Sequence, residues 1–288
     1  MQTAAEQDPN APWPADFVLS NEELTGFPSP GDDIGLSAHL YIAAIARSGS
    51  TFLGNLLTMP PTHWVMMEPW FVNGATARRL WKQAVGCGFE VGWEEWMVPA
   101  EERRKERFLE RYRTLLAPLL QRLEKWGAKE VRPQFHEPTI ATIRPRKVVV
   151  LVRSIGDVYL SLLERSYKDE PGRYTERWAR EYCGVASRTL VAMADSASGP
   201  GYMRVVRYED LMDCAEERRS LETWLDWPLG GDPERNLDML GRRYERFRHA
   251  ESAPASLTAA ERGLPEFVGA LAARLAEECR PYQQRFDY

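Results

Sequence analysis

The sequence predicts an α/β fold: a P-loop-like parallel β-sheet flanked by helices on both faces, in a single domain. Two apolar runs of strand length, residues 40–46 and 147–152, suit strands that are buried on both faces. A helical pattern follows each run, and this alternation is typical of a parallel sheet. A length of 288 residues favours one domain over two.

The other elements follow from periodicity and from turn residues. Residues 1–46 contain seven acidic residues and no Lys or Arg, and prolines recur before residue 31, so 1–37 is interpreted as a partly ordered arm and 38–288 as the domain. Pro118 is expected to kink or divide its helix. The expected elements are strand 40–46, helix 51–58, strand 64–67, helix 100–126, strand 129–132, helix 137–144, strand 147–152, helix 155–166, helix 174–195, strand 202–206, helix 209–226 and further helices toward the C-terminus.

Composition and charge argue against several classes of protein. No apolar stretch reaches the length of a membrane span, and the first residues lack the features of a secretory signal, so we expect a cytoplasmic protein. The four cysteines show no metal-ligand spacing, and no metal is predicted. Beyond the arm, 37 basic residues accompany 35 acidic ones, so no nucleic-acid surface is expected.

The turn after the first strand is the most informative segment. It reads Arg47-Ser48-Gly49-Ser50-Thr51, and Phe52 opens an apolar helical pattern. The amides of the turn and of the new helix converge where the helix dipole favours an anion, the hydroxyls add donors, and glycine permits close approach. We therefore predict that residues 47–52 form a phosphate cradle. A Walker A loop is excluded, because the G-x-x-x-x-G-K-[ST] pattern is missing.

A second phosphate site is predicted after the strand 147–152. Arg153 lies at the carboxyl end of this strand, which is the edge where ligands bind in α/β sheets. Ser161 lies two helical turns further on, on the face that can point back to Arg153. A guanidinium fork and a hydroxyl suit a terminal phosphate. The alternative is a core strand followed by an arginine that caps the helix.

These segments resemble those of sulfotransferases that use 3′-phosphoadenosine-5′-phosphosulfate (PAPS). The family's 5′-phosphosulfate loop reads [K/R]-S-G-[ST]-[ST], as in residues 47–51, and its 3′-phosphate segment has a strand-end Arg with a Ser eight residues later, as in Arg153 and Ser161. A third segment, RYEDL, is similar to the family's [RF]-Y-E-D-[LM] and implies that Tyr208 lies near the adenine. The resemblance covers roughly residues 40–288 and implies PAPS as donor and adenosine 3′,5′-bisphosphate (PAP) as product.

One part of the family pattern is not evident in this sequence. The C-terminal Arg-Lys-Gly phosphate clamp is missing, and Arg242, Arg243 or Arg248 would have to replace it. The 3′-phosphate site is therefore incomplete as the sequence presents it.

Two residues are predicted to be catalytic. Arg47 can neutralise charge on the leaving group, but an arginine does not act as a general acid. Glu68, in a Glu-Pro pair after the second strand, resembles the usual base of Arg-type sulfotransferases, and burial would have to raise its pKa. The alternative is a Glu that is paired structurally, for example with Arg47. His63, expected in an exposed turn, and His136, expected in a loop, are rivals on chemistry alone.

Three further residues are candidates for contacts with the acceptor or the sulfuryl group: Lys129, Trp70 and His136. Lys129 is similar in place to a basic residue of bacterial relatives, with an exposed strand-end lysine as the alternative. Trp70 belongs to a group of tryptophans that either walls an acceptor pocket or packs in the core.

We therefore expect metal-independent transfer of a sulfuryl group from PAPS to a hydroxyl of a small-molecule or carbohydrate acceptor. A nucleotide kinase-like P-loop enzyme and a non-catalytic protein that binds PAP or another nucleotide are the alternatives. The sequence does not indicate an oligomeric state.

Overall fold

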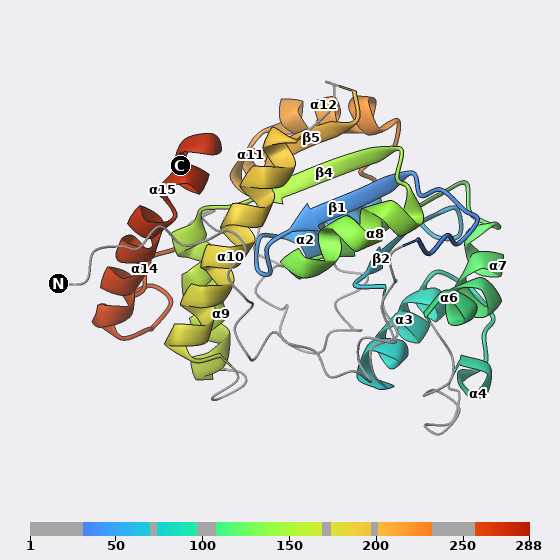
Figure 1. Cartoon of the computed structure of the whole chain (residues 1–288), viewed down its shortest axis with the longest axis horizontal. Coiled ribbons are helices and arrows are strands. Elements are labelled where there is room, and N and C mark those ends of the chain that lie inside the picture. Colours follow the sequence, from blue (N-terminus) through green and yellow to red (C-terminus); the bar gives the residue numbers. More distant parts are fainter. Residues whose placement is uncertain (1–30, 70–73, 97–107, 169–173, 197–200, 232–256) are drawn as a thin grey trace.

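Five parallel strands form one sheet in the order β2-β3-β1-β4-β5 (Figure 1). The computed structural model describes residues 31–69, 74–96, 108–168, 174–196, 201–231 and 257–288. The strands are β1 (Leu40–Ala44), β2 (His63–Met67), β3 (Lys125–Glu130), β4 (Lys147–Val152) and β5 (Met203–Arg207). The predicted α/β class with a parallel sheet is confirmed.

The strand order places a switch point at the carboxyl ends of β1 and β4. The chain leaves β1 through α2 (Ser50–Leu57) toward β2 on one side, and leaves β4 toward β5 on the other side. The connections after these two neighbouring strands therefore diverge. A crevice opens at such a point in α/β sheets and receives the ligand.

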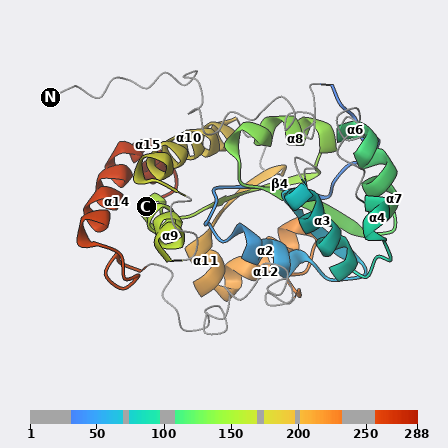
Figure 2. The same ribbon diagram turned by 90° about the horizontal axis from the view of Figure 1, so that it is seen from below.

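Helices cover both faces of the sheet (Figure 2). One face carries α2, α11 (Tyr208–Asp213) and α12 (Ala215–Leu225), and the other carries α8 (His136–Ile143) and α10 (Glu176–Asp195). The remaining helices are α3 (Gly74–Gly86), α4 (Trp93–Trp96), α6 (Phe108–Arg111), the π-helical η2 (Tyr112–Leu116), α7 (Ala117–Leu120), the 3₁₀-helical η3 (Pro133–Phe135), α9 (Ile155–Lys168), α14 (Glu266–Glu278) and α15 (Arg280–Arg285).

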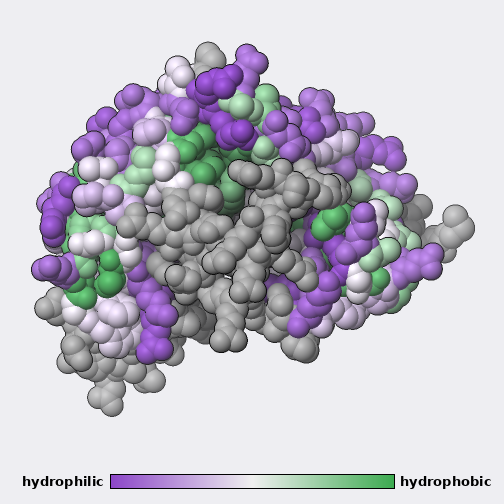
Figure 3. Space-filling view, turned by 180° about the vertical axis from the view of Figure 1, so that it is seen from behind, coloured by the Kyte–Doolittle hydropathy of each residue, from purple (hydrophilic) through white to green (hydrophobic). Residues whose placement is uncertain are grey.

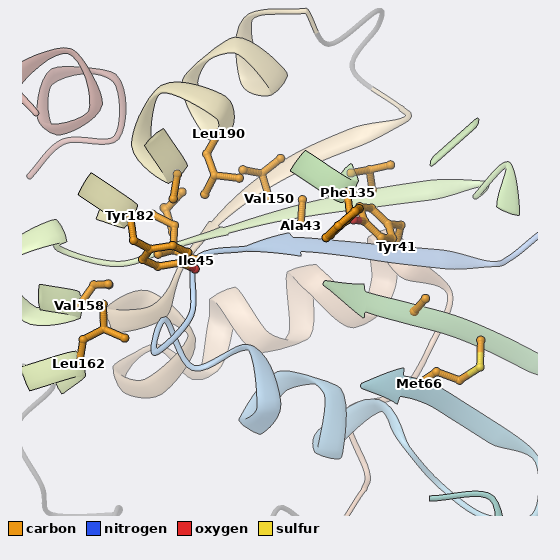
Figure 4. Packing of buried hydrophobic residues seen from close by; sticks show 14 of the residues in the cluster. Tyr41, Ala43, Ile45, Met66, Phe135, Val150, Val158, Leu162, Tyr182 and Leu190 are labelled. Carbon is orange, nitrogen blue, oxygen red and sulfur yellow. The ribbon is translucent and has the colours of Figure 1, made fainter. Parts of the chain in front are cut away.

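Alternate residues of each strand enter two separate cores. Tyr41, Ala43 and Ile45 pack in the larger cluster, which Figure 4 shows in part, and Leu40 and Ile42 pack in the smaller one, against α2 and α12. Because successive side chains of a strand point to opposite faces, a strand that is apolar throughout is buried on both sides. This burial fixes the register of β1, and with it the place where the cradle turn begins.

The predicted helix 100–126 is wrong beyond residue 120. Residues 97–107 lie outside the described ranges, and the chain then forms α6, η2 and α7 before a turn leads into β3. Pro118 lies in the first turn of α7, directly after the π-helical turn, so the predicted division at this proline is confirmed. A proline lacks the amide that would continue the helical hydrogen bonds.

Strand β3 begins four residues before the predicted strand 129–132. The Trp-Gly pair at its start suggests a turn, but Gly127 pairs with Leu40 in the middle of the sheet. A Cβ atom at Gly127 would lie 2.7 Å from the backbone oxygen of Leu40, so only glycine fits this close approach.

Smaller differences concern other boundaries. The predicted helix 209–226 is divided at Cys214, whose backbone is extended, and α3 was not predicted. Residues 1–30 of the predicted arm lie outside the described part of the chain. Within the rest of the arm, Ile34 is buried and Asp33 pairs with Arg144, so residues 31–37 contact the domain.

The C-terminal end of α2 is held by residues that lie far along the chain. The indole nitrogen of Trp227 donates to the carbonyl of Leu57 at 2.8 Å, and the amide of Gly231 donates to the carbonyl of Leu56 at 2.7 Å. A Cβ atom at Gly231 would lie 2.1 Å from the carbonyl oxygen of Asn55. Both contacts satisfy carbonyls that a helix end otherwise leaves unpaired.

Hydrophilic side chains dominate the surface seen in Figure 3, with apolar side chains gathered near its upper centre. Within the described ranges, no helix is both long enough and apolar enough to cross a lipid bilayer.

Candidate functional site

The turn between β1 and α2 has the geometry of an anion cradle. Gly49 is the N-cap residue of α2 with φ 83°, and no side chain caps the helix. The first turn of α2 contains no acidic residue. The amides of the first turn therefore remain available for a ligand, and the partial positive charge of the helix end is not countered from within that turn. Thr51 and Phe52, which follow the buried Ser50, are half-buried.

Two groups shape this turn from the inside. The hydroxyl of Ser48 donates to the carbonyl of Ile45 at 2.6 Å, and the Ser48 amide donates to the same oxygen at 3.2 Å. In this conformation Ser48 therefore supports the turn itself. The ring of Tyr208 packs on Gly49: a Cβ atom at Gly49 would lie 2.2 Å from Cδ2 of Tyr208. Glycine is needed here for its backbone angle and for its lack of a side chain.

Arg47, Ser161 and Arg153 converge beside the cradle. Nε of Arg47 donates to the hydroxyl of Ser161 at 3.0 Å, and Nη1 of Arg153 donates to the backbone carbonyl of Arg47 at 3.1 Å. The guanidinium of Arg153 also lies 4.7 Å from the centre of the Tyr208 ring. The structure thus brings four predicted residues together, although Ser161 contacts Arg47, which the sequence analysis did not predict.

The backbone at Arg153 and Ser154, directly after β4, is held by side chains from α11 and from the C-terminal end of the chain. The hydroxyl of Tyr282 accepts from the amide of Arg153 at 3.2 Å and donates to its carbonyl at 2.9 Å. Glu209 accepts from the amide of Ser154 at 3.3 Å and from the hydroxyl of Tyr288 at 2.6 Å. Helices α11 and α15 and the C-terminal Tyr288 therefore hold the backbone at Arg153 and Ser154.

Arg262 is a further arginine of this region that the sequence analysis missed. Its guanidinium lies 3.0 Å from a carboxylate oxygen of Glu164 and 3.6 Å from one of Asp157. These carboxylates flank Ser161 on one face of α9, and Arg262 is buried there. Arg242, Arg243 and Arg248, the predicted replacements for the C-terminal clamp, lie outside the described residues.

Glu68 and Lys129 meet at the carboxyl ends of β2 and β3. Nζ of Lys129 lies 3.2 Å from Oε1 of Glu68, and Nη1 of Arg79 lies 2.7 Å from Oε2. Lys129 is only 3% exposed, so the alternative of a solvent-exposed strand-end lysine is wrong. Just beyond the end of β3, Arg132 donates to both carboxylate oxygens of the buried Glu130, at 2.9 and 2.8 Å.

The pKa of Glu68 does not behave as the sequence analysis required. Burial alone would raise this pKa, but the charges of Lys129 and Arg79 outweigh burial and lower it to about 2. The carboxylate is therefore ionised at any working pH, and it is a weak base while Lys129 and Arg79 hold it. The raised pKa that an efficient base requires is therefore not present in this arrangement.

Arg47 and Glu68 share an unusual backbone conformation. Their φ angles are 71° and 55°, in the left-handed region that residues other than glycine rarely adopt. Glu68 directly follows β2, and Arg47 follows β1 after two intervening residues. Such strain persists where the surrounding structure enforces it, and it is concentrated at functional sites.

The two histidines proposed as rival bases are placed away from the cradle or inside the core. His63 is the first residue of β2, so it lies at the amino-terminal edge of the sheet, opposite to Glu68. His136 begins α8, is 1% exposed and lies 2.7 Å through Nδ1 from the hydroxyl of Tyr41. Burial lowers the pKa of His136 to about 4. Both expectations about their surroundings, an exposed turn and a loop, are wrong.

The described tryptophans of the aromatic-rich region divide between core and surface. Trp64 and Trp96 are buried in the larger core, whereas Trp81 and Trp93 form an edge contact with ring centres 5.2 Å apart and are partly buried. Trp70 lies outside the described residues, so the acceptor wall predicted there stays a prediction.

Arg79, Tyr182 and Tyr282 were also missed by the sequence analysis. Arg79 lies in α3, a helix for which no element was predicted, and the two tyrosines act through single hydroxyl groups. No local motif marks such residues. Within the described ranges, no group of three or more His, Cys, Asp or Glu side chains is arranged to hold a metal ion.

Comparison with known proteins gives a consistent picture of the fold. No protein-family model matches the sequence, and no curated protein matches it. Among solved structures, the chain is similar to the sulfotransferase domain from the Synechococcus PCC 7002 olefin synthase, with 17% identity, a TM-score of 0.54 and coverage of 87% of this chain and 96% of that one. It is also similar to the sulfotransferase domain from the curacin biosynthetic pathway, with 17% identity, a TM-score of 0.51 and coverage of 88% and 98%. The chain therefore has the sulfotransferase fold.

Proposed function

We propose that this protein transfers a sulfuryl group from PAPS to a hydroxyl of a small-molecule or carbohydrate acceptor. The observation that carries the proposal is the convergence of an uncapped helix N-terminus with Arg47, Ser161 and Arg153 at the switch point of the sheet. A neutral ligand would not need this concentration of donors, whereas a ligand with two separate anionic groups would use both arginines.

The residues present fit such a donor. The cradle amides and Arg47 suit the 5′-phosphosulfate, and Arg153 with Ser161 suits the 3′-phosphate. The ring of Tyr208, between Gly49 and the guanidinium of Arg153, is near enough to both sites to contact the nucleoside that joins the two anionic groups. When bound, PAPS supplies the sulfuryl group and leaves as PAP.

Arg47 stabilises the negative charge that develops on the leaving phosphate oxygen. Its guanidinium stays protonated, and its position is fixed by Ser161 and by the backbone turn. A hydrogen-bond donor that is held in position before the reaction needs no reorganisation in the transition state. Such electrostatic stabilisation is often the largest single contribution to catalysis.

Glu68 is the proposed acceptor for the hydroxyl proton, with Lys129 beside it. In the free protein the ammonium of Lys129 keeps the pKa of Glu68 low. Engagement of Lys129 by the oxygens of the sulfuryl group would weaken its hold on Glu68 and raise the pKa of that carboxyl group, which makes it a better base. The Glu68–Lys129 pair thereby couples donor binding to proton acceptance.

The reaction is assigned to the cytoplasm because all four cysteines are free thiols, which suits a reducing compartment. Arg47, Arg153 and Lys129 supply the cationic charge that a metal ion would otherwise provide, so we propose that the reaction needs no metal.

Nucleotide binding by calorimetry tests the donor assignment. PAP is expected to bind at least tenfold more tightly than AMP, which lacks the 3′-phosphate, and Arg153→Ala is expected to remove most of this preference. Arg144→Ala, which removes an exposed arginine that pairs with Asp33, is the matched control and should keep it. Equal affinity of the unmodified protein for PAP and AMP would contradict the proposed 3′-phosphate site.

A further inference from the structure

Two buried tyrosine hydroxyls each connect backbone groups at the carboxyl edge of the sheet. The hydroxyl of Tyr182 accepts from the amide of Ala46 at 2.6 Å and donates to the carbonyl of Val131 at 2.7 Å. The hydroxyl of Tyr282 makes the corresponding pair of bonds with the amide and the carbonyl of Arg153. Both side chains are 2% exposed or less, and they come from α10 and α15.

The Tyr182 hydroxyl bridges strands β1 and β3 just beyond their last backbone pair. Strands β1 and β3 pair as far as Ala43 and Glu130, and beyond that rung the hydroxyl lies between the amide of Ala46 and the carbonyl of Val131. Figure 4 shows Tyr182 beside Ile45 at the carboxyl end of β1. The hydroxyl therefore replaces a direct backbone bond and sets the separation of the two strand ends.

The position of Ala46 gives this contact a consequence for the cradle. Ala46 directly precedes Arg47, whose left-handed backbone starts the turn into α2. On the other side of the hydroxyl, Val131 follows the strand that carries Lys129. One hydroxyl group thus fixes the backbone next to Arg47 relative to the strand of Lys129.

The Tyr282 hydroxyl holds the other anion-binding part of the site, at Arg153. Its two bonds hold the amide and the carbonyl of Arg153 itself, the residue whose guanidinium lies over Tyr208. Because both backbone groups of one residue are held, the direction in which the Arg153 side chain leaves the strand is fixed. Tyr282 contacts no other residue of the proposed phosphate cradle among the hydrogen bonds of the described residues.

We propose that Tyr182 and Tyr282 are positioning residues, each of which sets one anion-binding arm: Tyr182 the 5′ arm at Arg47, and Tyr282 the 3′ arm at Arg153. This inference rests on the proposed function, because it assumes that the two arms bind the two ends of one nucleotide. It adds that the backbone of each arm is held by its own tyrosine, from different helices of the same layer, while the Arg153 guanidinium also donates to the Arg47 carbonyl.

Separate alignment predicts a distinct pattern of affinities for PAP and AMP. Tyr282→Phe should weaken PAP about 3- to 10-fold and leave AMP nearly unchanged, so the ratio of the two affinities falls, as expected for the loss of hydrogen bonds that hold only the 3′ arm. Tyr182→Phe should weaken both nucleotides by a similar factor, because both carry the 5′-phosphate, and the ratio should stay constant.

Tyr112→Phe is the matched control. Tyr112 is also fully buried in the larger core, but it lies in η2, near the opposite end of the sheet from α9 and α15 (Figure 1). Its substitution should change neither affinity. The ratio of two affinities measured on one sample does not depend on the fraction of protein that is folded, so a general loss of stability cannot imitate the expected result.

Calorimetric titration of each variant with PAP and with AMP decides the matter. An unchanged ratio in Tyr282→Phe, or an equal fall of the ratio in all three variants, would overturn the inference while leaving the proposed function intact. If Tyr282→Phe does not fold, Glu209→Ala, which releases the amide of Ser154 beside Arg153, should lower the same ratio. Failure of the unmodified protein to bind PAP would overturn the proposed function and this inference with it.

Discussion

The two halves of the carboxyl edge of the sheet handle charge in different ways. At β1 and β4, Arg47 and Arg153 donate to neutral oxygens, the Ser161 hydroxyl and the Arg47 carbonyl. At β2 and β3, Lys129 and Arg132 donate to carboxylates, those of Glu68 and Glu130. A guanidinium that donates to a neutral oxygen keeps its attraction for an added anion, whereas an ion pair must first be opened.

Under the proposed function, the β1–β4 half binds the PAPS molecule and the β2–β3 half supplies the base. The β1–β4 half brings two guanidinium groups and the Ser161 hydroxyl to one place, where an anionic ligand can contact them. The β2–β3 half holds a carboxylate whose basicity depends on the cation beside it. A donor that enters between the halves would bind at the first and change the charge balance at the second.

Glu68→Gln is expected to have the largest effect, because it removes the proposed base from the β2–β3 half. Turnover should fall about 10²- to 10⁴-fold with PAP affinity unchanged, and the free energy of unfolding should fall by about 1–3 kcal/mol because the buried Lys129 loses its charged partner. Steady-state kinetics and calorimetry measure these effects.

The control for this change is Asp226→Asn. Asp226 pairs with Lys125 on the same strand as Lys129, but at the opposite edge of the sheet. That variant should keep full turnover. Near-normal transfer by Glu68→Gln would show that the base lies elsewhere.

Arg47→Gly tests the β1–β4 half and should have the next largest effect. Turnover should fall about 10²- to 10³-fold and PAP affinity should weaken as well, because Arg47 contacts the phosphosulfate before and during the reaction. Stability should change by less than about 1 kcal/mol, since glycine relieves the left-handed backbone while the bond to Ser161 is lost.

Arg144→Gly supplies the comparison for that variant. Arg144 also has a positive φ, of 40°, at the end of α8. Its replacement should match or raise stability and leave turnover unchanged. Equal losses of turnover in both glycine variants would show that backbone strain, rather than the Arg47 guanidinium, explains the effect.

The free energy of unfolding should depend on pH through two groups with lowered pKa values, His136 and Glu68. The pKa of His136 is lowered from 6.5 to about 4, so the unfolded chain takes up its proton first. This contribution to stability is complete above pH 6.5 and is lost as the pH falls toward about 4, by up to about 3 kcal/mol. The contribution of Glu68 is complete above pH 4.5 and is lost below it, down to about pH 2.

Urea unfolding at several pH values measures this dependence. His136→Gln should flatten the curve between pH 6.5 and 4 and leave the fall below pH 4.5 in place. If the variant has the same pH dependence as the unmodified protein, His136 is not the group responsible.

The smallest expected effect is that of a chelator. Because arginines and a lysine carry the cationic charge of the proposed site, EDTA should leave turnover unchanged. Loss of activity that Mg²⁺ restores would instead favour a kinase-like reaction, and ATP turnover would then be measured.

The sequence predicted the donor half of the site better than the acceptor half, for a physical reason. Residues 47–52 form a contiguous motif, and a strand-end arginine can be recognised from the apolar run before it. Glu68 and Lys129 were named, but these two residues are 61 positions apart in the sequence, and the partner Arg79 comes from a helix that periodicity did not reveal. The pKa of Glu68 depends on those partners, so the sequence could state what a base requires but not the shift that the structure shows.

The same limit applies to the fold. Continuous apolar runs identified β1 and β4, because burial on both faces leaves a strong local pattern. Strand β3 was displaced because Gly127 serves a contact with β1, and a single glycine does not distinguish such close packing from a turn. The buried tyrosines that hold the strand ends leave no local signal.

The capping of α2 has a consequence for how the chain is made. Trp227 and Gly231 bond the last carbonyls of a helix whose first residue is Ser50. These partners lie far beyond α2 in the sequence, so a growing chain cannot complete the bonds at the C-terminal end of this helix until residue 231 has been added. A chain that stops before Trp227 would contain residues 47–52 and still lack both groups that bond the C-terminal end of α2.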